Sequence, residues 1–478
     1  MTNVKKGNYR WSICMLLFFA TTINYMDRQV LSLTWKDFIS PEFHWTNSDY
    51  GLITALFSIF YAVSMLFAGR LVDWLDTKKG FLWAIGVWSI GAVLHAFCGI
   101  ATSGIVAGEW FVGFHGAKEA IATVNDVSRV INVSVVLFIF ARFVLAVGEA
   151  GNFPAAIKAT AEYFPKKDRA LSTSIFNAGA TVGALAAPLT IPVIAETWGW
   201  EMSFIIIGAL GFVWMGFWNF MYKKPHEHPK VNKAELEYIM QDNDHEPEPA
   251  AGQKAKKVSL RGAFKYKQTW AFAFGKFMTD GVWWFFLFWM PAYLSSVYDI
   301  KSSDTEGQLA IFVLYLITLL SIIGGWLPTY FVEKKGLDPY QGRMRSMLIF
   351  AFIPLIVLVA QPLGHISYWV PVLLIGFAAA AHQAWSANIF STVGDMFPRR
   401  MIATVTGIGG LAGGVGSTFI NYGSGLLFDH AGQTQMKFMG FQGEEAGYFI
   451  VFSFCAVAYL IAWFVMKSLV PRMEMIKD

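Results

Sequence analysis

Residues 69–80 read GRLVDWLDTKKG and residues 325–336 read GWLPTYFVEKKG, so two glycines, a leucine and a Lys-Lys pair recur at an offset of 256. A second pair of segments is also related: EYFPKK at 162–167 recurs as DMFPRR at 395–400, at an offset of 233. Repeats of this kind indicate that the chain consists of two related halves. Because the offsets differ by 23, the first half carries about 23 extra residues, which fall near 102–129.

The chain is too apolar for a soluble protein. Of its 478 residues, 55% are hydrophobic and 15% are charged, a composition typical of proteins with many membrane spans. Windows of about 20 apolar residues predict an all-α membrane protein with twelve transmembrane helices, six in each half. The predicted spans lie near 11–33, 50–72, 80–101, 131–156, 169–193, 202–222, 269–296, 308–332, 346–362, 368–393, 400–424 and 447–468.

The predicted organisation is a six-helix half over residues 1–222, a linker over 223–268 and a second six-helix half over 269–478. The linker is rich in proline and in charged residues, and such a composition does not bury a core. We expect a short interfacial helix at 233–242 in the linker and a short amphipathic helix at 118–123 in the extra segment.

The placement of Lys and Arg predicts the orientation. If the amino terminus is cytoplasmic, the cytoplasmic segments hold 29 of the 37 Lys and Arg residues, as the positive-inside rule requires. An even number of spans then places both termini in the cytoplasm and the extra segment outside, in the inner (plasma) membrane of the cell. The net charge of +4 therefore reflects topology and does not indicate a nucleic-acid partner. We expect a monomer in the lipid bilayer.

Charged residues inside apolar segments are the first candidates for function. Asp27 and Arg28 lie in the first predicted span, and Arg142 and Glu149 lie in the fourth. A charge in hydrocarbon costs several kcal/mol, so such residues usually face a protein interior or a water-filled path and do work there. The four residues together predict an ion-coupled site for an anion.

Arg142 and Glu149 share one helix face, but about 10.5 Å of helix rise separates them, so each needs a partner from another helix. We expect Arg142 to pair with Asp27, Glu149 or both, depending on protonation. The alternative is a static buried ion pair that only holds helices together. The three cysteines of the chain show neither metal-ligand spacing nor a disulfide framework, so we expect no metal site.

Two motifs point to known transporters. The segment 69–73 with Lys78 and Lys79 resembles the loop between helices two and three of the major facilitator superfamily, although Asp76 replaces the second glycine of that loop. NYMDR at 24–28 and GEAGNFP at 148–154 resemble the anion:cation symporter family within that superfamily.

Two further motifs narrow the class. KFMTDGVWW at 276–284 and HQAWS at 382–386 are similar to bacterial hexuronate transporters. The resemblance covers nearly the whole chain apart from the extra segment. It implies a secondary active transporter, not an enzyme, which moves a sugar acid such as galacturonate or glucuronate together with protons by alternating access. It implies no cofactor other than the co-transported proton.

The resemblance also assigns roles to residues. Asp27 and Glu149 take the role of proton-coupling groups, and Arg28 and Arg142 contact the substrate carboxylate or take part in coupling. Arginine suits this contact because its planar guanidinium binds a carboxylate through two parallel hydrogen bonds. The gating loop comprises Gly69, Asp73, Lys78 and Lys79.

Polar and aromatic residues in other spans are candidates for binding the sugar. Hydroxyl groups of a sugar need neutral donors and acceptors, and an indole can stack on the ring. For Lys276 the alternative is an ion pair with Asp280 one turn along the same helix. His382 is a possible proton carrier, although a lone membrane histidine is more often structural. The substrate-binding candidates are Tyr25, Tyr61, Asn177, Lys276, Trp284, Gln383, Trp385, Ser386, Asn388 and Asn421.

Other functions stay open at this point. Within transport, the substrate is alternatively an aldonate, glucarate or another organic anion, and the coupling ion is alternatively sodium. Outside transport, a membrane sensor is the alternative, although a sensor has no need of coupling carboxylates. A membrane enzyme needs a catalytic set at an interface, and the sequence contains none.

Overall fold

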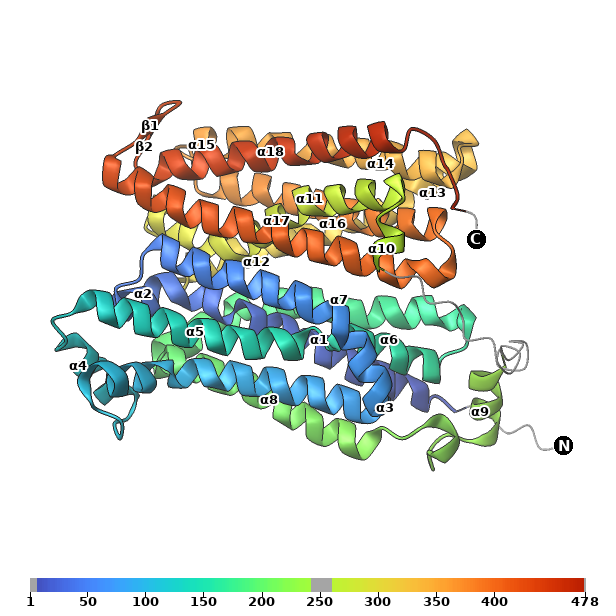
Figure 1. Ribbon diagram of the computed structural model, residues 1–478, viewed down its shortest axis with the longest axis horizontal. Coiled ribbons are helices and arrows are strands. Elements are labelled where there is room, and N and C mark those ends of the chain that lie inside the picture. Colours follow the sequence, from blue (N-terminus) through green and yellow to red (C-terminus); the bar gives the residue numbers. More distant parts are fainter. Residues whose placement is uncertain (1–6, 242–259, 477–478) are drawn as a thin grey trace.

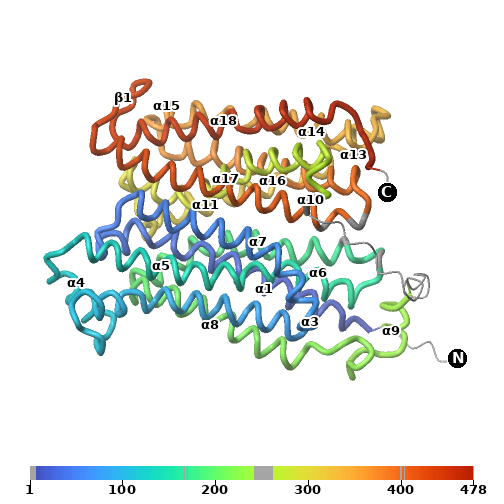
Figure 2. Tube along the Cα trace, viewed as in Figure 1, coloured from blue at the N-terminus to red at the C-terminus, as the bar shows by residue number. Residues whose placement is uncertain are grey.

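The computed structural model describes residues 7–241 and 260–476. Two bundles of helices lie side by side, with most helices along the long axis of the molecule (Figures 1 and 2). The first bundle, blue to green, contains the first half of the chain, and the second, yellow to red, contains the second half. Both chain ends lie at one end of the bundles, here called the terminus face. The extra segment lies at the opposite end, here called the insertion face.

The first half contains nine α-helices, a π-helical stretch and a short 3-10 helix among the described residues. In chain order these are α1 (Tyr9–Thr34), the π-helix (Trp35–Ile39), α2 (Ser40–Phe43), α3 (Asn47–Ala107), α4 (Phe114–Ala122), α5 (Val127–Glu149), α6 (Asn152–Tyr163), α7 (Lys166–Trp198), α8 (Trp200–Met221), the 3-10 helix (Pro225–Glu227) and α9 (Lys233–Met240).

The second half follows the same plan, with two 3-10 segments inside its helices and a two-residue hairpin at the insertion face. Its elements are α10 (Leu260–Ala263), α11 (Lys267–Tyr298), α12 (Thr305–Ile317), a 3-10 segment (Thr318–Ile322), α13 (Ile323–Lys335), α14 (Pro339–Phe352), a 3-10 segment (Ile353–Val359), α15 (Ala360–Leu363), α16 (Trp369–Met396), α17 (Arg399–Thr434), β1 (Lys437–Phe438), β2 (Phe441–Gln442) and α18 (Glu444–Leu469). In the hairpin, Lys437 is opposite Gln442 and Phe438 is opposite Phe441, in antiparallel register.

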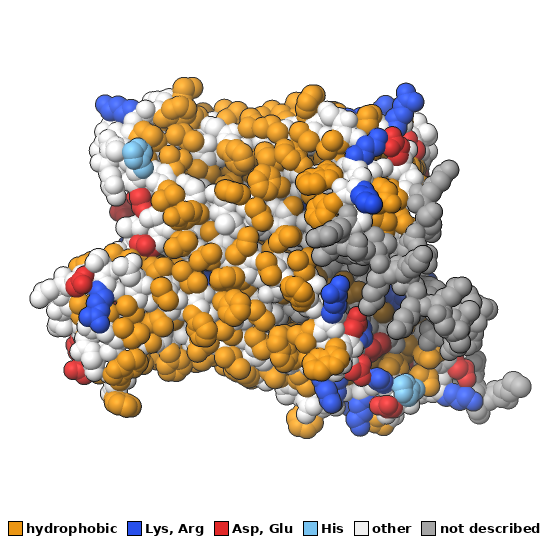
Figure 3. All heavy atoms as spheres, in the orientation of Figure 1, with side chains coloured by type: hydrophobic (Ala, Val, Ile, Leu, Met, Phe, Trp, Pro, Cys, Tyr) orange, Lys and Arg blue, Asp and Glu red, His pale blue; other side chains and the backbone are white. Residues whose placement is uncertain are grey.

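The membrane spans agree with the sequence prediction. Among the described residues, eight helical segments are long and apolar enough to cross a membrane. One of them is α3, whose 61 residues form two spans because the chain reverses at Asp76, where φ is 68° and ψ is 159° (Figure 1). Three further long helices, α1, α11 and α17, contain more polar residues and complete the twelve predicted spans. Figure 3 shows hydrophobic side chains across the middle of one face and charged side chains toward its two ends.

Glycines allow the helices around the functional site to approach closely. A Cβ atom on Gly148 of α5 would lie 2.2 Å from the backbone nitrogen of Trp88 on α3. A Cβ atom on Gly183 of α7 would lie 2.4 Å from the carbonyl oxygen of Thr22 on α1. Only glycine fits such contacts, which are typical of membrane helices packed backbone to backbone.

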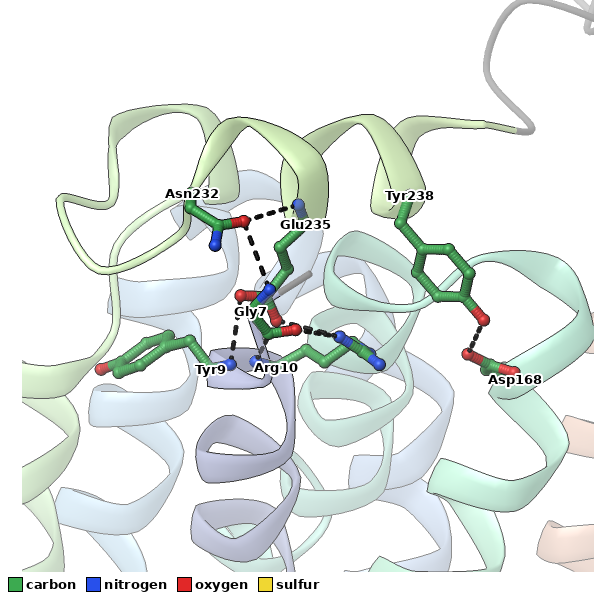
Figure 4. Close-up of polar contacts among 7 residues, drawn as sticks. All are labelled: Gly7, Tyr9, Arg10, Asp168, Asn232, Glu235 and Tyr238. Carbon is green, nitrogen blue, oxygen red and sulfur yellow. Dashed lines mark hydrogen bonds and ion pairs between the residues drawn. The ribbon is translucent and has the colours of Figure 1, made fainter. Parts of the chain in front are cut away.

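Both short helices expected outside the spans are present. The extra segment forms α4, somewhat longer than predicted, which buries Ala117 and Ile121. The linker forms α9, which lies over the first turn of α1 (Figure 4). The rest of the linker between 242 and 259 lies outside the described residues.

Candidate functional site: a buried charge cluster beside a central cavity

Arg28 on α1 and Glu149 at the end of α5 form a buried ion pair. Nε and Nη2 of Arg28 donate to Oε2 of Glu149 at 3.0 and 2.6 Å. The two side chains are 5% and 0% exposed. α5 ends at Glu149 and α6 begins at Asn152. The break follows from Pro154, which has no N–H to donate to the carbonyl of Ala150.

Four aromatic rings surround the guanidinium of Arg28. Its Cζ lies 4.7 Å from the ring centroid of Tyr61, 5.0 Å from Trp284, 5.2 Å from Tyr25 and 6.0 Å from Phe57. Each ring face attracts a cation, with a free energy of about 0.5–2 kcal/mol. Trp284 belongs to α11, so a side chain from the second half completes the surroundings of a charge in the first half.

Asp27 and Arg142 lie in the same interior but do not form the predicted ion pair. Both carboxylate oxygens of Asp27, and Nε and Nη1 of Arg142, are buried without a hydrogen-bond partner in the part of the chain that the structure describes. The expectation that Arg142 pairs with Asp27 or Glu149 is wrong for this conformation. Glu149 is already bound to Arg28, and the Arg142 guanidinium lies 5.0 Å from the ring centroid of Phe57.

A cavity of about 600 Å³ lies between the two halves, next to the charge cluster. Three of the predicted binding residues line it: Tyr25 and Asn177 from the first half and Gln383 from the second. Because the Tyr25 ring also contacts Arg28, the cavity and the charge cluster are adjacent. None of the described residues that line the cavity is charged. Its polar lining of hydroxyl and amide groups suits the hydroxyls of a sugar.

Further cavity residues were not predicted from the sequence. Trp283 lines the cavity and stacks on His382, with ring centroids 5.4 Å apart and planes 9° apart. Its neighbour Trp284, which was predicted, faces Arg28 instead. Both indoles belong to the motif KFMTDGVWW at 276–284, and this motif was the available signal. The remaining hydroxyl-bearing lining residues, which no motif marks, are Ser174, Thr181, Tyr315, Thr318 and Ser321.

Four of the predicted binding residues on α16 and α17 do not line this cavity. Asn388 Nδ2 donates to the carbonyl of Gly324 at 2.8 Å, which joins two helices of the second half. Asn421 Oδ1 accepts a 3.0 Å hydrogen bond from Nε1 of Trp289. Trp385 is fully buried, and Ser386 is partly buried. Asn388 and Asn421 therefore serve packing in this conformation.

Lys276 and Asp280 form the intrahelical pair that was the alternative to substrate contact. Nζ of Lys276 lies 2.7 Å from Oδ2 of Asp280, and the two side chains are 6% and 16% exposed. The same Nζ lies 4.1 Å from the ring centroid of Phe390. His382 is also satisfied, since its Nδ1 lies 2.8 Å from the hydroxyl of Tyr459. Lys276 therefore has a carboxylate partner of its own and does not line the cavity.

The predicted gating loop forms the bend of α3. Asp73 Oδ1 lies 3.2 Å from Nζ of Lys158 on α6, and the same Nζ donates to the carbonyl of Val72. The carboxylate therefore pairs with a lysine side chain of its own half. A side chain at Gly69 would meet no atom within 4 Å, so close packing does not require glycine there.

Hydrogen bonds join the two halves near the insertion face. Asp37, after α1, accepts from Oγ of Ser295 at 2.9 Å and from N and Oγ of Ser302 at 2.8 and 2.7 Å. Asp429 of α17 accepts from N and Nδ2 of Asn47 at 2.9 and 3.0 Å. These contacts hold the halves together on the insertion-face side of the charge cluster. Among the described residues, no group of three or more His, Cys, Asp or Glu side chains is placed to hold a metal ion.

Comparisons with known proteins agree with this architecture. Residues 17–421 match the Major Facilitator Superfamily. The hexuronate transporter of Escherichia coli (strain K12) is 27% identical over 427 residues, which cover 88% of each chain. A probable galactarate/D-glucarate transporter of the same strain is 25% identical over 429 residues, covering 88% of this chain and 87% of the relative.

Solved structures share the fold. A bacterial homologue of the human lysosomal transporter Spinster, in an inward-facing and occupied conformation, has a TM-score of 0.69 at 18% identity, covering 98% of this chain and 99% of that one. A D-xylose-proton symporter has a TM-score of 0.65 at 15% identity, covering 98% and 100%. The chain belongs to the major facilitator superfamily, and it is a multi-pass membrane transporter of small molecules, not an enzyme.

Proposed function

We propose that the chain is a proton-coupled symporter of a sugar-acid monoanion, a hexuronate such as galacturonate or glucuronate. The observation that carries this proposal is the buried charge cluster beside the cavity. In it, Arg28 and Glu149 are paired, while Asp27 and Arg142 have no ion-pair partner among the described residues.

In this proposal, charge balance in the cluster couples the binding of a proton to the binding of the anion. The charges of Arg28 and Lys276 are compensated by Glu149 and Asp280. When Asp27 is ionised, its charge cancels that of Arg142 across the site. When Asp27 binds a proton, the positive charge of Arg142 is no longer compensated, and an uncompensated buried charge is costly. One substrate carboxylate neutralises it, so anion binding and a proton on Asp27 favour each other.

The cavity provides the rest of the recognition. In this proposal the substrate carboxylate binds Arg142 and the sugar ring occupies the cavity, where Tyr25, Asn177 and Gln383 offer hydroxyl and amide groups to its hydroxyls. The exposed part of the Trp283 indole offers an apolar face to the ring. A single free guanidinium favours a substrate with one carboxylate.

The relatives support a sugar acid as the substrate, but their substrates are of two kinds. One is a hexuronate transporter, and another is a probable transporter of galactarate and D-glucarate, which are dicarboxylates. A dicarboxylate is therefore the second candidate. Three basic side chains are buried within the predicted spans that the structure describes, Arg28, Arg142 and Lys276; Arg28 and Lys276 are paired, which leaves Arg142 for a carboxylate and favours the monoanion.

The proposed cycle is alternating access in the inner membrane by a monomer, with the terminus face in the cytoplasm. The positive-inside rule supports this orientation. With the insertion face closed by Asp37 and Asp429, the described conformation corresponds to the state that is closed toward the outside.

Uptake into proteoliposomes tests the proposal. Labelled galacturonate, glucuronate and galactarate are supplied with an inward proton gradient, an inward sodium gradient or neither. We expect accumulation of a hexuronate only with the proton gradient, abolished by a protonophore and in Asp27→Asn. Glu119→Gln, an exposed carboxylate in α4, is the matched control and should transport normally.

Three results would reject parts of the proposal. Accumulation driven by sodium alone would reject proton coupling. Preferential uptake of galactarate would reject the monoanion. Absence of uptake of all three, with folded protein, would reject the sugar-acid class.

A further inference from the structure

A second cavity lies at the terminus face of the first half, apart from the transport site. Its volume is about 450 Å³, and it is formed by the bend of α3 and by the chain that follows α8. Six charged side chains line it: Lys78, Lys79, Lys223 and Lys224, with Asp76 and Glu227. The lysines outnumber the carboxylates, so the cavity is positive.

Among the described residues, one of the four lysines has a carboxylate partner, one is hydrogen-bonded to a backbone carbonyl, and two have neither. Lys224 Nζ lies 3.2 Å from Oδ2 of Asp76, and Lys78 Nζ donates to the carbonyl of Asn219 at 2.7 Å. Lys79 and Lys223 form no ion pair or hydrogen bond with a side chain that the structure describes, and both are exposed. Lys79 and Lys223 therefore carry the ammonium groups of this cavity that are not already engaged within the protein.

The backbone at Asp76 is strained, and the side chain of this residue forms part of the cavity wall. Its φ of 68° with ψ of 159° is a conformation that only glycine adopts readily. In return, Asp76 Oδ1 accepts from the backbone nitrogen of Thr77 at 2.8 Å and Oδ2 holds Lys224. A strained residue whose carboxylate fixes a cavity wall points to a function for that wall.

A buried network makes the cavity rigid. Glu162 of α6 accepts a hydrogen bond from the Thr77 hydroxyl and another from the Tyr222 hydroxyl. Thr77 follows the bend of α3 and Tyr222 follows α8, so one carboxylate joins the two walls of the cavity. The lysines therefore project from a fixed frame.

Exposed aromatic side chains flank the cavity. Trp74, beside Leu75 of the cavity wall, is 80% exposed, and Phe220, two residues before Tyr222, is 82% exposed. Aromatic residues at the ends of spans mark the level of lipid headgroups. The cavity thus lies where a headgroup meets the protein.

We propose that this cavity binds the phosphate headgroup of an anionic phospholipid, with Lys79 and Lys223 as the main contacts and Lys78 and Lys224 as the supporting charges. Basic pockets between membrane helices are suited to such headgroups. The lipid would bridge the α3 bend and the end of α8. The bend contains the predicted gating loop, and the linker follows α8. This inference rests on the membrane fold and not on the transported substrate.

Native mass spectrometry of the full chain tests the proposal. Protein released from micelles is titrated with phosphatidylglycerol or with phosphatidylcholine, which has no net charge. We expect the wild-type chain to retain phosphatidylglycerol preferentially. In Lys79→Gln/Lys223→Gln the affinity should fall about twenty-five-fold, since each lysine near a headgroup contributes on the order of fivefold. Lys334→Gln/Lys335→Gln is the matched control, because it removes the exposed pair that the repeat places in the equivalent loop of the second half.

A thermal titration of the wild-type chain gives an independent readout. Phosphatidylglycerol should raise Tm more than phosphatidylcholine does, and inorganic phosphate should leave Tm unchanged. Equal retention of the two lipids, or equal loss of binding in both double variants, would overturn the proposal. Stabilisation by inorganic phosphate alone would assign the site to a free anion and would also overturn it.

Discussion

Two buried carboxylates in the charge cluster differ in their surroundings. Glu149 is bound to Arg28, whereas Asp27 has no hydrogen-bond partner among the described residues. Glu149→Gln leaves Arg28 as a buried charge without its counter-ion, and we expect it to lose about 3 kcal/mol of unfolding free energy. Asp27→Asn removes a carboxylate without a partner and should not destabilise the fold. Thermal unfolding in detergent measures both.

A double variant separates pairing from other effects. If the ion pair accounts for the loss, Arg28→Gln/Glu149→Gln should be more stable than the sum of the single losses predicts. Equal destabilisation by Asp27→Asn and Glu149→Gln would contradict the difference between the two sites.

Glu42, in α2 at the insertion face, predicts a pH dependence of stability. Burial raises the pKa of its carboxyl from 4.5 to about 7. Because the folded state holds this proton more tightly than the unfolded state, the contribution to stability is complete below about pH 4.5. It is lost as the pH rises through 7, with a total change of about 3 kcal/mol.

Glu42→Gln isolates this effect. The amide stays neutral and keeps an oxygen for the hydrogen bond that Oε2 of Glu42 accepts from Nε1 of Trp200 at 2.9 Å. The Tm difference between Glu42→Gln and the wild type should be small at pH 4 and should widen toward pH 8. A difference independent of pH would contradict the assignment.

At this scale, the sequence predicted which charged residues lie in the buried interior but not how they pair. Charges in apolar segments are conspicuous, so Asp27, Arg28, Arg142 and Glu149 were identified directly. Their pairing depends on where α5 ends and how closely it packs on α3, and both are tertiary properties. Asn388 and Asn421 were misplaced because helical spacing shows which residues share a face but not whether that face meets a cavity or another helix.

At the scale of elements, helix α9 acts as a clamp on α1. Glu235 accepts from the backbone nitrogens of Tyr9 and Arg10 at 3.2 and 3.0 Å and from Nη1 of Arg10 at 3.1 Å. Tyr238 donates to Asp168 of α7 at 2.7 Å (Figure 4). One short helix of the linker thus joins the starts of two spans that line the cavity.

Removing the clamp should loosen the first turn of α1. In Glu235→Ala, two backbone amides and the buried Arg10 lose their acceptor, which costs on the order of 3 kcal/mol. Hydrogen exchange should accelerate at Tyr9 and Arg10 while the centre of α1 stays protected. Tyr238→Phe removes one partly buried hydrogen bond, that to Asp168, and should change hydrogen exchange at Tyr9 and Arg10 much less. Unchanged exchange in Glu235→Ala would show that α9 does not hold α1.

The two elements outside the spans show what local sequence can predict. Residues 233–242 were expected to form an interfacial helix and residues 118–123 an amphipathic helix, and α9 and α4 lie there. The role of α9 as a clamp was not predicted, because the partners of Glu235 lie more than 200 residues away in sequence.

At the scale of the whole molecule, the halves are held together at the insertion face by Asp37 and Asp429. Charge-assisted hydrogen bonds contribute about 1.5–3 kcal/mol each. Asp37→Asn/Asp429→Asn should therefore raise the ratio of molecules that are open at the insertion face to molecules that are closed there by on the order of a hundredfold. Spin labels at Glu119 and Lys437, exposed on opposite halves, report the separation; the native cysteines are buried.

The wild-type chain should give a short distance and the double variant a longer one or a mixture. Asp304→Asn is the matched control, because its carboxylate accepts from Lys301 within its own half. Identical distance distributions in all three proteins would show that Asp37 and Asp429 do not hold the two halves together at the insertion face.

The fold itself was predictable because repeats, composition and charge placement act over long windows. The offsets of 256 and 233 already imply two halves and an extra segment. Windows of about 20 apolar residues also found the spans α1, α11 and α17, even though their hydropathy is weaker. The conformational state was not predictable, since it depends on contacts such as that between Asp429 and Asn47, which bring together residues from different halves.

Proton uptake on substrate binding is the sharpest test of coupling through Asp27. Calorimetric titration of the purified protein with galacturonate, in buffers of different ionisation enthalpy, gives the number of protons bound with each anion. The charge-balance account predicts about one proton per galacturonate in the wild-type chain near neutral pH and none in Asp27→Asn. Galacturonate binding with no proton uptake, or with the same uptake in Asp27→Asn, would contradict it.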